Sequence, residues 1–429
     1  MIRSTRDFNR YFAGETVSTF GSAVSGTAVT VLAVRNFHVP IGSLGVLIAC
    51  GTVPAVVCGL VGGSIGDRIR RPRRALIGFD LLAAAALTVV AAGLWLGSAT
   101  VVWLCLLNAV LSGLTATAEI LYFVHLKGLT GTDGPELARA RGRLQAGEQG
   151  ARVTARGLSG ILLAAVGGAG ALCLDALTYL LSVTALSSIQ APDHAASRSP
   201  VAPASHREPV WRAFVCDVGV GIGVLLARPY LRRLSASLLI STCAAGASAP
   251  LIAPFLLRTL AIPTPLYGLL SASASVAGLL GSLVAVRVAH RSHRRLLLVG
   301  YAGVALSACV VPVAAGPLAV AASIAALGLM LPVLFGAIAN VGLTSLVTSD
   351  VPEDVLGRAV AALQTATALT TLLGCLAGGV LGSALGARSA LWIAAMLSAA
   401  SALLLIRMPA PSGRITAAPQ RPRTADVAA

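Results

Sequence analysis

Charged residues inside apolar segments have the greatest potential for chemistry in this sequence. Glu148, Arg152 and Arg156 recur at intervals of four residues within an apolar run, so a helix places all three on one face. With a rise of about 1.5 Å per residue, Arg156 lies roughly 15 Å into that helix. The stripe predicts either a cavity wall, where Arg156 contacts an anionic or carbonyl-rich group while a carboxylate titrates, or an ion-pair network that locks helices together, for instance Glu119 with Arg152.

Other acidic residues also interrupt apolar runs. An ionisable group at the centre of a spanning helix costs about 2.5–3.5 kcal/mol on insertion scales, so it tends to face a cavity or a partner. Glu15 and Glu119 are expected to line the same cavity as the stripe, with an interfacial position as the alternative for Glu15. Asp80 is expected to pair with arginines of the preceding loop, and Asp175 to favour the positive end of a helix dipole.

The composition is typical of an integral membrane protein. Of 429 residues, 56% are hydrophobic and only 11% are charged, whereas soluble domains carry about 25% charged residues. The net charge of +16 comes with only 4% aromatic residues. The arginines stand at the edges of apolar segments rather than forming a basic patch, so no nucleic-acid partner is expected.

Several functional classes lack the residues that they need. The eight cysteines are scattered without a C-x-x-C pair, and the six histidines form no ligand cluster with them. Neither a metal site nor a disulfide framework is therefore expected. No nucleophile–base constellation indicates an enzyme, and no Walker pattern indicates an ATP-driven pump.

Twelve apolar runs are long enough to span a bilayer, which takes roughly 20 residues each. The tenth run is long and contains Pro332, which predicts a kink or an extension beyond the bilayer. The sequence therefore predicts an all-α membrane protein with twelve transmembrane helices. The runs lie near residues 11–34, 42–64, 75–96, 100–123, 146–166, 171–189, 231–257, 266–288, 295–315, 317–347, 359–384 and 387–407.

The distribution of basic residues predicts the orientation. Twelve spans place both termini on one side, and nearly all Lys and Arg residues lie in the tails and loops of that side. The opposite side keeps little beyond Arg35, Arg258 and Arg388. By the positive-inside rule, both termini are cytoplasmic in a multi-pass protein of the inner (plasma) membrane.

Composition also divides the chain into four parts. Two six-helix bundles, residues 1–189 and 231–407, are separated by a stretch rich in Pro, Ser and charge. That stretch, 190–230, is expected to be a cytoplasmic linker. The tail 408–429 is expected to be disordered.

The two bundles repeat one another weakly. The stretch beginning at Glu136 aligns with the stretch beginning at Asp354, so that Arg139 meets Arg358 and Gly160 meets Gly379 at one constant offset. The arginine-rich loop "GGSIGDRIRRPRRAL" has a weaker copy, "GSLVAVRVAHRSHRRLL", without the aspartate. Parallel six-helix repeats are typical of one transporter architecture.

The motifs carry a resemblance to a known family. The loop after the second run has Gly63, Asp67, Arg68 and Arg71, which resembles the G-x-x-x-D-R-x-x-R-R signature of the major facilitator superfamily. The stretches "DALTYLLS", "LLARPYLRRL" and "VPEDVLGRAVAALQ" resemble its exporter branch, which includes macrolide-efflux and enterobactin-exporter types. The likeness extends over almost the whole chain.

The resemblance implies two pseudo-symmetric six-helix bundles that rock about a central site. It also implies that Asp67 belongs to a cytoplasmic gate, where it meets the amino-terminal end of helix 11 in the outward-facing state. Arg139 and Arg358, like Asp80 and Asp175, are expected to be structural or gating charges. Two positions depart from the family: "ARGLSG" replaces G-P-x-x-G-G in helix 5, and helix 4 carries no arginine.

The predicted function is secondary active transport. We expect proton-coupled efflux of a small amphipathic organic compound, such as a drug, natural product or siderophore, without a cofactor. Glu15 or Glu148, and then Glu119, are the carboxylates expected to titrate. The protein is expected to be a monomer in contact with lipid. Uptake or facilitated diffusion is the alternative, and a non-transporting receptor or scaffold is a further one.

Overall fold

The computed structural model of this chain is helical throughout the part that it describes. No strand occurs in that part, and 11 of its helices are long and apolar enough to cross a membrane. The side chains of several helix ends, among them 59–68 and 210–218, are not described. The described residues are 5–68, 71–130, 135–189, 210–288, 293–351 and 353–406.

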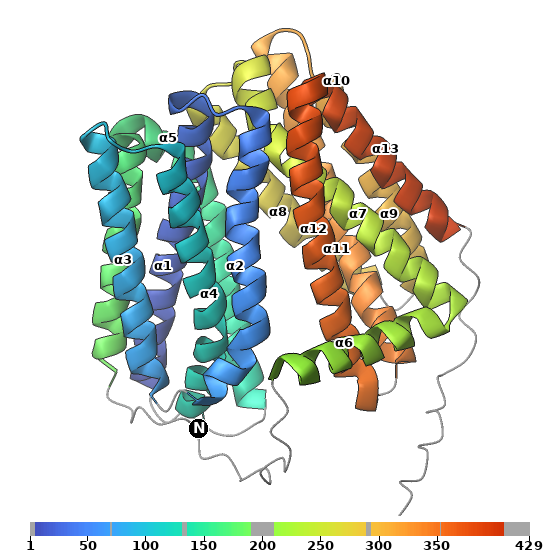
Figure 1. The fold of residues 1–429 in the computed structure, drawn as a ribbon, viewed down its shortest axis with the longest axis horizontal. Coiled ribbons are helices and arrows are strands. Elements are labelled where there is room, and N and C mark those ends of the chain that lie inside the picture. Colours follow the sequence, from blue (N-terminus) through green and yellow to red (C-terminus); the bar gives the residue numbers. More distant parts are fainter. Residues whose placement is uncertain are drawn as a thin grey trace, which may run out of the picture.

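The helices fall into two bundles in chain order (Figure 1). The first half comprises α1 (Thr5–Val31) with the π-helical turn η1 (Leu32–Asn36), α2 (Ile41–Arg68), α3 (Pro72–Trp95), α4 (Val101–Thr130) and α5 (Pro135–Ser187). The second half comprises α6 (Val210–Ala227), α7 (Pro229–Pro254) with the turn η2 (Phe255–Thr259), α8 (Thr264–Val288), α9 (His293–Ala308), α10 (Val310–Val313), α11 (Leu318–Asp350), α12 (Glu353–Leu385) and α13 (Ala387–Ile406).

Helix α5 contains two membrane crossings joined at Gly167. Its apolar part, Gly142–Ser187, is 46 residues long, about twice what one crossing requires. Gly167 has φ 71° and ψ 178°, which interrupts the helix. The break falls between the predicted spans 146–166 and 171–189, so the described chain makes the twelve crossings that the sequence predicts.

The backbone repeats between the halves, as the sequence predicts. The four glycines with positive φ form two pairs, Gly97 with Gly316 and Gly167 with Gly386. Both pairs keep the register that aligns Gly160 with Gly379. The turns η1 and η2 are also alike, since each is followed by a non-glycine residue of positive φ: His38 (48°) after η1 and Ala261 (50°) after η2.

Helix α6 corrects the expectation that residues 190–230 are only a linker. The Pro- and Ser-rich composition ends at Pro209, and the apolar segment "VWRAFVCDVGVGIGVLLA" that follows forms a helix. Figure 1 shows α6 lying across one end of the second half. Its Leu225 is buried in a cluster with Tyr230 and Leu231. Residues 190–209 and the predicted tail 408–429 lie outside the described part.

Two other spans differ in detail from their predictions. The run 295–315 forms two helices, α9 and α10, rather than one. The run with Pro332 forms α11, an unbroken helix of 33 residues with the proline inside it. Because about 20 residues suffice to span the bilayer, α11 is long enough to extend beyond it.

The two halves approach closely at the end of the molecule that carries η1 and η2. Figure 1 shows them leaning together there and diverging toward the end that carries the N-terminus. Glycines make the approach possible. A Cβ on Gly160 of α5 would lie 2.7 Å from the Cα of Pro265 in α8. A Cβ on Gly379 of α12 would lie 3.2 Å from the Cα of Gly45 in α2.

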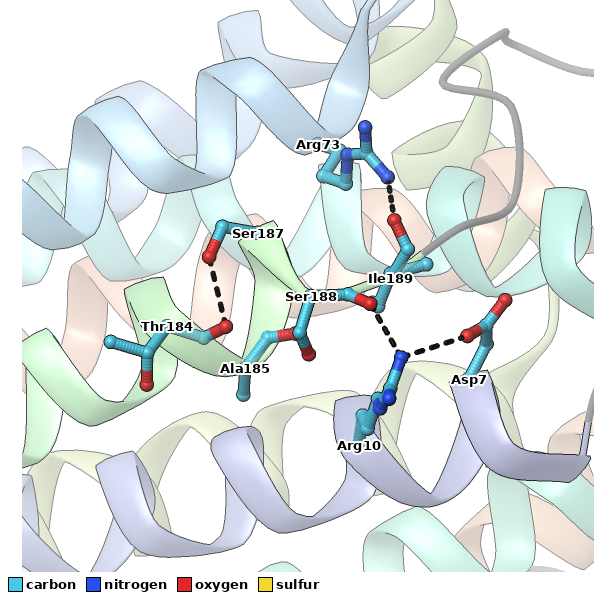
Figure 2. Close-up of polar contacts among 8 residues, drawn as sticks. All are labelled: Asp7, Arg10, Arg73, Thr184, Ala185, Ser187, Ser188 and Ile189. Carbon is cyan, nitrogen blue, oxygen red and sulfur yellow. Dashed lines mark hydrogen bonds and ion pairs between the residues drawn. The ribbon is translucent and has the colours of Figure 1, made fainter.

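Arginines near the amino-terminal end hold the last turn of α5. Figure 2 shows Arg10 donating to the Ser188 carbonyl oxygen (2.5 Å) and standing 3.7 Å from the Asp7 carboxylate. Arg73 donates to the Ile189 carbonyl oxygen at 2.5 Å. Cations are favourable at the carboxyl end of a helix, where carbonyl groups lack helical partners. Arginines in the first turns of α1 and α3 therefore join these helices to the end of α5, in addition to any effect on orientation.

Candidate functional site

A cavity of about 580 Å³ lies within the first half, between α1, α3, α4 and α5. It gathers all five residues that the sequence marks as candidates for substrate or proton coupling, together with one acidic residue that was expected elsewhere. We call it the charged cavity. Its ionisable lining consists of the acidic residues Glu15, Asp80, Glu119 and Glu148, the basic residues Arg152 and Arg156, and the tyrosines Tyr11, Tyr122 and Tyr179.

The helical stripe on α5 forms one wall of the charged cavity, as its spacing predicts. Arg152 Nη2 lies 3.8 Å from Glu148 Oε2, one turn away on the same helix. The two side chains are 43% and 23% exposed, respectively. The ion pair therefore forms along α5, rather than between Glu119 and Arg152 as the alternative arrangement suggests.

Arg156 reaches across to the second half. Its Nη1 donates to the Ser275 hydroxyl oxygen of α8 at 2.6 Å, while the residue still lines the charged cavity. One turn further along α5, Gly160 lies against α8. The guanidinium is thus placed where the cavity meets the second half, and Ser275 is a partner that sequence reasoning did not identify.

Asp80 lines the cavity rather than pairing with arginines of the preceding loop, as the sequence suggests. The side chain is only 3% exposed and lines the charged cavity. Its Oδ2 has no hydrogen-bond partner among the described residues. Helix α3 begins at Pro72, three residues before the predicted run, so Asp80 lies about two turns into the helix, beyond the loop arginines. Arg73 of that loop donates to the Ile189 carbonyl oxygen instead.

Asp175 lies in a buried hydroxyl network beside the cavity. The side chain is 0% exposed. Its Oδ2 accepts from Ser25 at 2.5 Å, and its Oδ1 accepts from Thr178 at 3.2 Å. Ser22 of α1 donates to the Tyr179 hydroxyl at 3.0 Å in the same region. The network ties α1 to α5 beyond Gly167, and the structural role of Asp175 stays a prediction.

The cytoplasmic-gate motif is described only in part. The side chains of Gly63, Asp67 and Arg68 lie outside the described residues, as does that of Arg139. Arg71 is exposed and directly precedes α3. Arg358 is exposed on α12. The role predicted for Asp67 stays a prediction.

At the opposite end from the N-terminus, two arginines join the halves in a reciprocal arrangement. Arg35 of η1 donates from Nη2 to the Ile262 carbonyl oxygen at 2.9 Å. Arg258 of η2 donates from Nη1 to the Val39 carbonyl oxygen at 3.1 Å, and from Nη2 to that of Val34 at 2.5 Å. Its Nε also donates to Val34, at 3.1 Å. We call these contacts the arginine clasp.

The clasp follows the repeat. Arg35 is the fourth residue of η1 and Arg258 the fourth of η2. The receiving residues Val39 and Ile262 occupy equivalent places after the two turns. The sequence does hold a signal for this pair, since both "LAVRN" and "FLLRT" end an apolar run with an arginine on the poorly charged side.

Metal ligation has no support in the described residues, where no three His, Cys, Asp or Glu side chains gather closely enough to hold an ion. The cavity carboxylates therefore stand as separate groups, each with a different environment. They can bind cations of a ligand or exchange protons, and both require access from water through the charged cavity.

Comparison with known proteins identifies the fold. The sequence profile described as Major Facilitator Superfamily matches residues 234–428, whereas no curated protein matches the chain. The nucleoside transporter NupG superposes with a TM-score of 0.70 at 12% identity, covering 94% of this chain and 99% of that chain. A bacterial homolog of the human lysosomal transporter Spinster, in an inward-facing and unoccupied conformation, gives 0.68 at 15% identity, covering 94% and 95%.

A POT family transporter in complex with a thioalcohol-conjugated peptide is also similar, with a TM-score of 0.67 at 11% identity and coverage of 94% and 95%. At these identities the likeness concerns the fold. It agrees with the match over residues 234–428 and with the repeated backbone of the two halves. The chain is thus a multi-pass membrane protein with the fold of the major facilitator superfamily.

Proposed function

We propose that this chain is a secondary active transporter that works by alternating access. The observation that carries the proposal is the position of the charged cavity: it lies inside one half of a two-half bundle whose halves are clasped at one end and diverge at the other. Rocking of the halves would break the clasp and expose the cavity to the opposite side. The similar Spinster homolog is described as inward-facing and unoccupied.

The direction that we propose is export. The positive-inside pattern assigns the end with the N-terminus to the cytoplasm, so the halves diverge toward the cytoplasmic side. A compound to be exported would enter the charged cavity from there. Resemblance of the sequence to the exporter branch supports the same direction, with a drug, natural product or siderophore as substrate. The location is then the inner (plasma) membrane, with both termini in the cytoplasm.

The energy source that we propose is the proton gradient. Glu15, Glu119 and Glu148 line the charged cavity, where each can take up a proton when the cavity faces one side and release it when it faces the other. Protonation drives such a cycle only if it changes the relative stability of the two states. Arg156 supplies the coupling element, because its bond to Ser275 links the cavity to the second half.

Transport in inverted membrane vesicles from expressing cells tests the proposal. With an acidic vesicle interior, addition of a transported antibiotic or siderophore should release luminal protons, reported by a pH-sensitive dye. Export moves the compound into these vesicles, and uptake moves it out. Glu119→Gln should abolish the proton signal while the protein remains in the membrane. Accumulation that survives collapse of the pH gradient would contradict proton coupling.

A further inference from the structure

Building on the proposed function, we infer that the substrate is an organic cation, such as a protonated or quaternary amine on an aromatic or apolar body. Its positive charge is held by the carboxylates of Glu15, Asp80 and Glu119 in the charged cavity. This differs from the anionic or carbonyl-rich ligand that the sequence suggests for Arg156. Three properties of the cavity support the inference: its charge balance, an unpartnered carboxylate oxygen and its aromatic walls.

The charge balance of the cavity is acidic. Four carboxylates and two guanidinium groups line it. Arg152 lies beside Glu148, and Arg156 donates to Ser275 of the second half. Within the described part of the chain, none of the other three carboxylates forms an ion pair. A concave site with an excess of one sign of charge attracts ligands of the other sign, because its low-dielectric walls focus the field.

Asp80 gives independent support for a binding role of this cavity. Its side chain is 3% exposed, and its Oδ2 lacks a hydrogen-bond partner among the described residues while the residue lines the cavity. Burying an acceptor without a partner is costly. An ammonium N–H of a ligand supplies the donor, and its charge offsets that of the carboxylate.

The aromatic residues suit the body of such a cation. Phe79, Tyr122 and Tyr179 line the cavity together with Tyr11. Aromatic faces within about 6 Å attract ammonium groups, including quaternary ones that cannot donate a hydrogen bond. The volume of about 580 Å³ lies within the usual range of small-molecule pockets. The site therefore fits one aromatic or aliphatic cation.

Binding of a cation and of a proton are mutually exclusive at one carboxylate. When the cation enters, the proton leaves the carboxyl oxygen for water, and one positive charge replaces another. Every titratable group facing the site contributes to this balance, and they come from all four helices. They are Tyr11 and Glu15 of α1, Asp80 of α3, Glu119 and Tyr122 of α4, and Glu148, Arg152, Arg156 and Tyr179 of α5.

Equilibrium binding of radiolabelled tetraphenylphosphonium to the purified full-length protein tests the inference. Tetraphenylborate has the same shape and the opposite charge. We expect saturable binding of the cation that weakens as the pH falls, and no saturable binding of the anion. Asp80→Asn and Glu119→Gln should each weaken cation binding about tenfold, as expected for loss of one favourable ionic contact. Size-exclusion elution of each variant reports whether it folds.

Asp350→Asn is the matched control. Asp350 lies at the end of α11, accepts from the Tyr230 hydroxyl at 2.9 Å and does not line the cavity. It should leave cation binding unchanged. Preferential binding of tetraphenylborate, or cation binding that neither cavity variant weakens, would overturn the inference.

The same probe separates this inference from the proposed function. If the vesicles transport neutral or anionic compounds and tetraphenylphosphonium neither binds nor competes, the cation assignment fails and transport stands. If the cation binds saturably and Asp80→Asn weakens it, the assignment stands. Failure of the bound cation to cross the membrane in vesicles would then count against transport alone.

Discussion

The two halves of this protein share a backbone plan and differ in where they keep charge. Both have a π-helical turn with an arginine, and both have glycine joints of positive φ at matching places. Yet at the register of the repeat, the charged residues of the cavity and Asp175 face uncharged counterparts in the second half. The pairs are Glu15 and Leu234, Asp80 and Val299, Glu119 and Ile338, Glu148 and Thr367, Arg152 and Thr371, Arg156 and Cys375, and Asp175 and Ala394.

The features that the two halves share are contacts between the halves, and the feature that they do not share is charge inside the helices. Rocking needs equivalent contacts on both sides of the axis, which the clasp and the glycine contacts supply. Binding needs charge at one place only. Because each charge inside a spanning helix costs about 2.5–3.5 kcal/mol on insertion scales, a charge kept in one half and absent from the other points to a role beyond the fold.

The largest expected effect on transport comes from replacing Glu148 of the first half, compared with the equivalent residue of the second half. Glu148→Gln should lower transport about 100-fold, because the stripe loses a titrating group and Arg152 loses its partner. Thr367→Val, at the equivalent place in α12, should change transport less than about twofold, since its hydroxyl donates only to Gln364 of its own helix. Initial rates in vesicles measure both.

A swap of the two residues tests the same asymmetry more severely. In the double variant Glu148→Thr with Thr367→Glu, the total charge is kept and its location is exchanged. Transport should remain lost. Recovery of activity would mean that the halves are interchangeable around the central site.

The two arginines of the clasp should contribute unequally to holding the halves together. Arg258 makes three hydrogen bonds across the interface and Arg35 makes one. Two of the Arg258 bonds share the Val34 oxygen, so Arg258 holds one more carbonyl group than Arg35 does. At about 1.5 kcal/mol for one further hydrogen bond to a charged group, Arg258→Ala should open the clasped end about tenfold more than Arg35→Ala. Labelling of a Thr264→Cys reporter beside the clasp by a membrane-impermeant maleimide measures the opening. Equal labelling in both variants would show that the clasp works as one symmetric unit.

The contacts at Gly160 and Gly379 should differ in how well they tolerate an alanine side chain. A Cβ on Gly160 would meet the Thr264 carbonyl oxygen at 2.5 Å, whereas a Cβ on Gly379 would meet that of Gly42 at 3.0 Å. Backbone atoms cannot turn aside, so Gly160→Ala should lower the melting temperature by about 5 °C. Gly379→Ala should lower it by less than half as much. Thermal unfolding of the two purified variants, compared side by side, decides between this order and its reverse.

The smallest effect concerns Asp175, a buried charge outside the charged cavity. Asp175→Asn keeps one acceptor, and the hydroxyls of Ser25 and Thr178 can reorient around the new amide. We expect a loss of about 1 kcal/mol in stability and unchanged tetraphenylphosphonium binding. A change in binding larger than the change in stability would extend the binding site into the α1–α5 hydroxyl network.

Much of the fold is predictable from the sequence because its signals are local. Apolar runs predict the twelve crossings, and the spacing of Glu148, Arg152 and Arg156 predicts one wall of the cavity. The alignment of Gly160 with Gly379 identifies the repeat. These inferences use only hydrophobicity and helical periodicity, which neighbouring residues determine.

The rest depends on distances between helices, which no local pattern contains. Ser275 meets Arg156 only because α5 and α8 approach across the two halves. Asp80 joins the cavity because α3 packs against α4 and α5 with that side of the helix toward them. The clasp has backbone carbonyl acceptors, which are present at every residue and therefore leave no mark in the sequence. Helix α6 was missed because its apolar segment adjoins a polar one.

The groups that form the clasp do not titrate at physiological pH, which bears on where the proposed proton coupling can act. Arginine stays charged at all physiological pH values, and a backbone carbonyl does not titrate. The described contacts of Arg35 and Arg258 therefore hold equally well in acid and in neutral solution. In the proposed cycle, acidity outside the cell leaves these contacts untouched, and the proton acts at a carboxylate of the charged cavity.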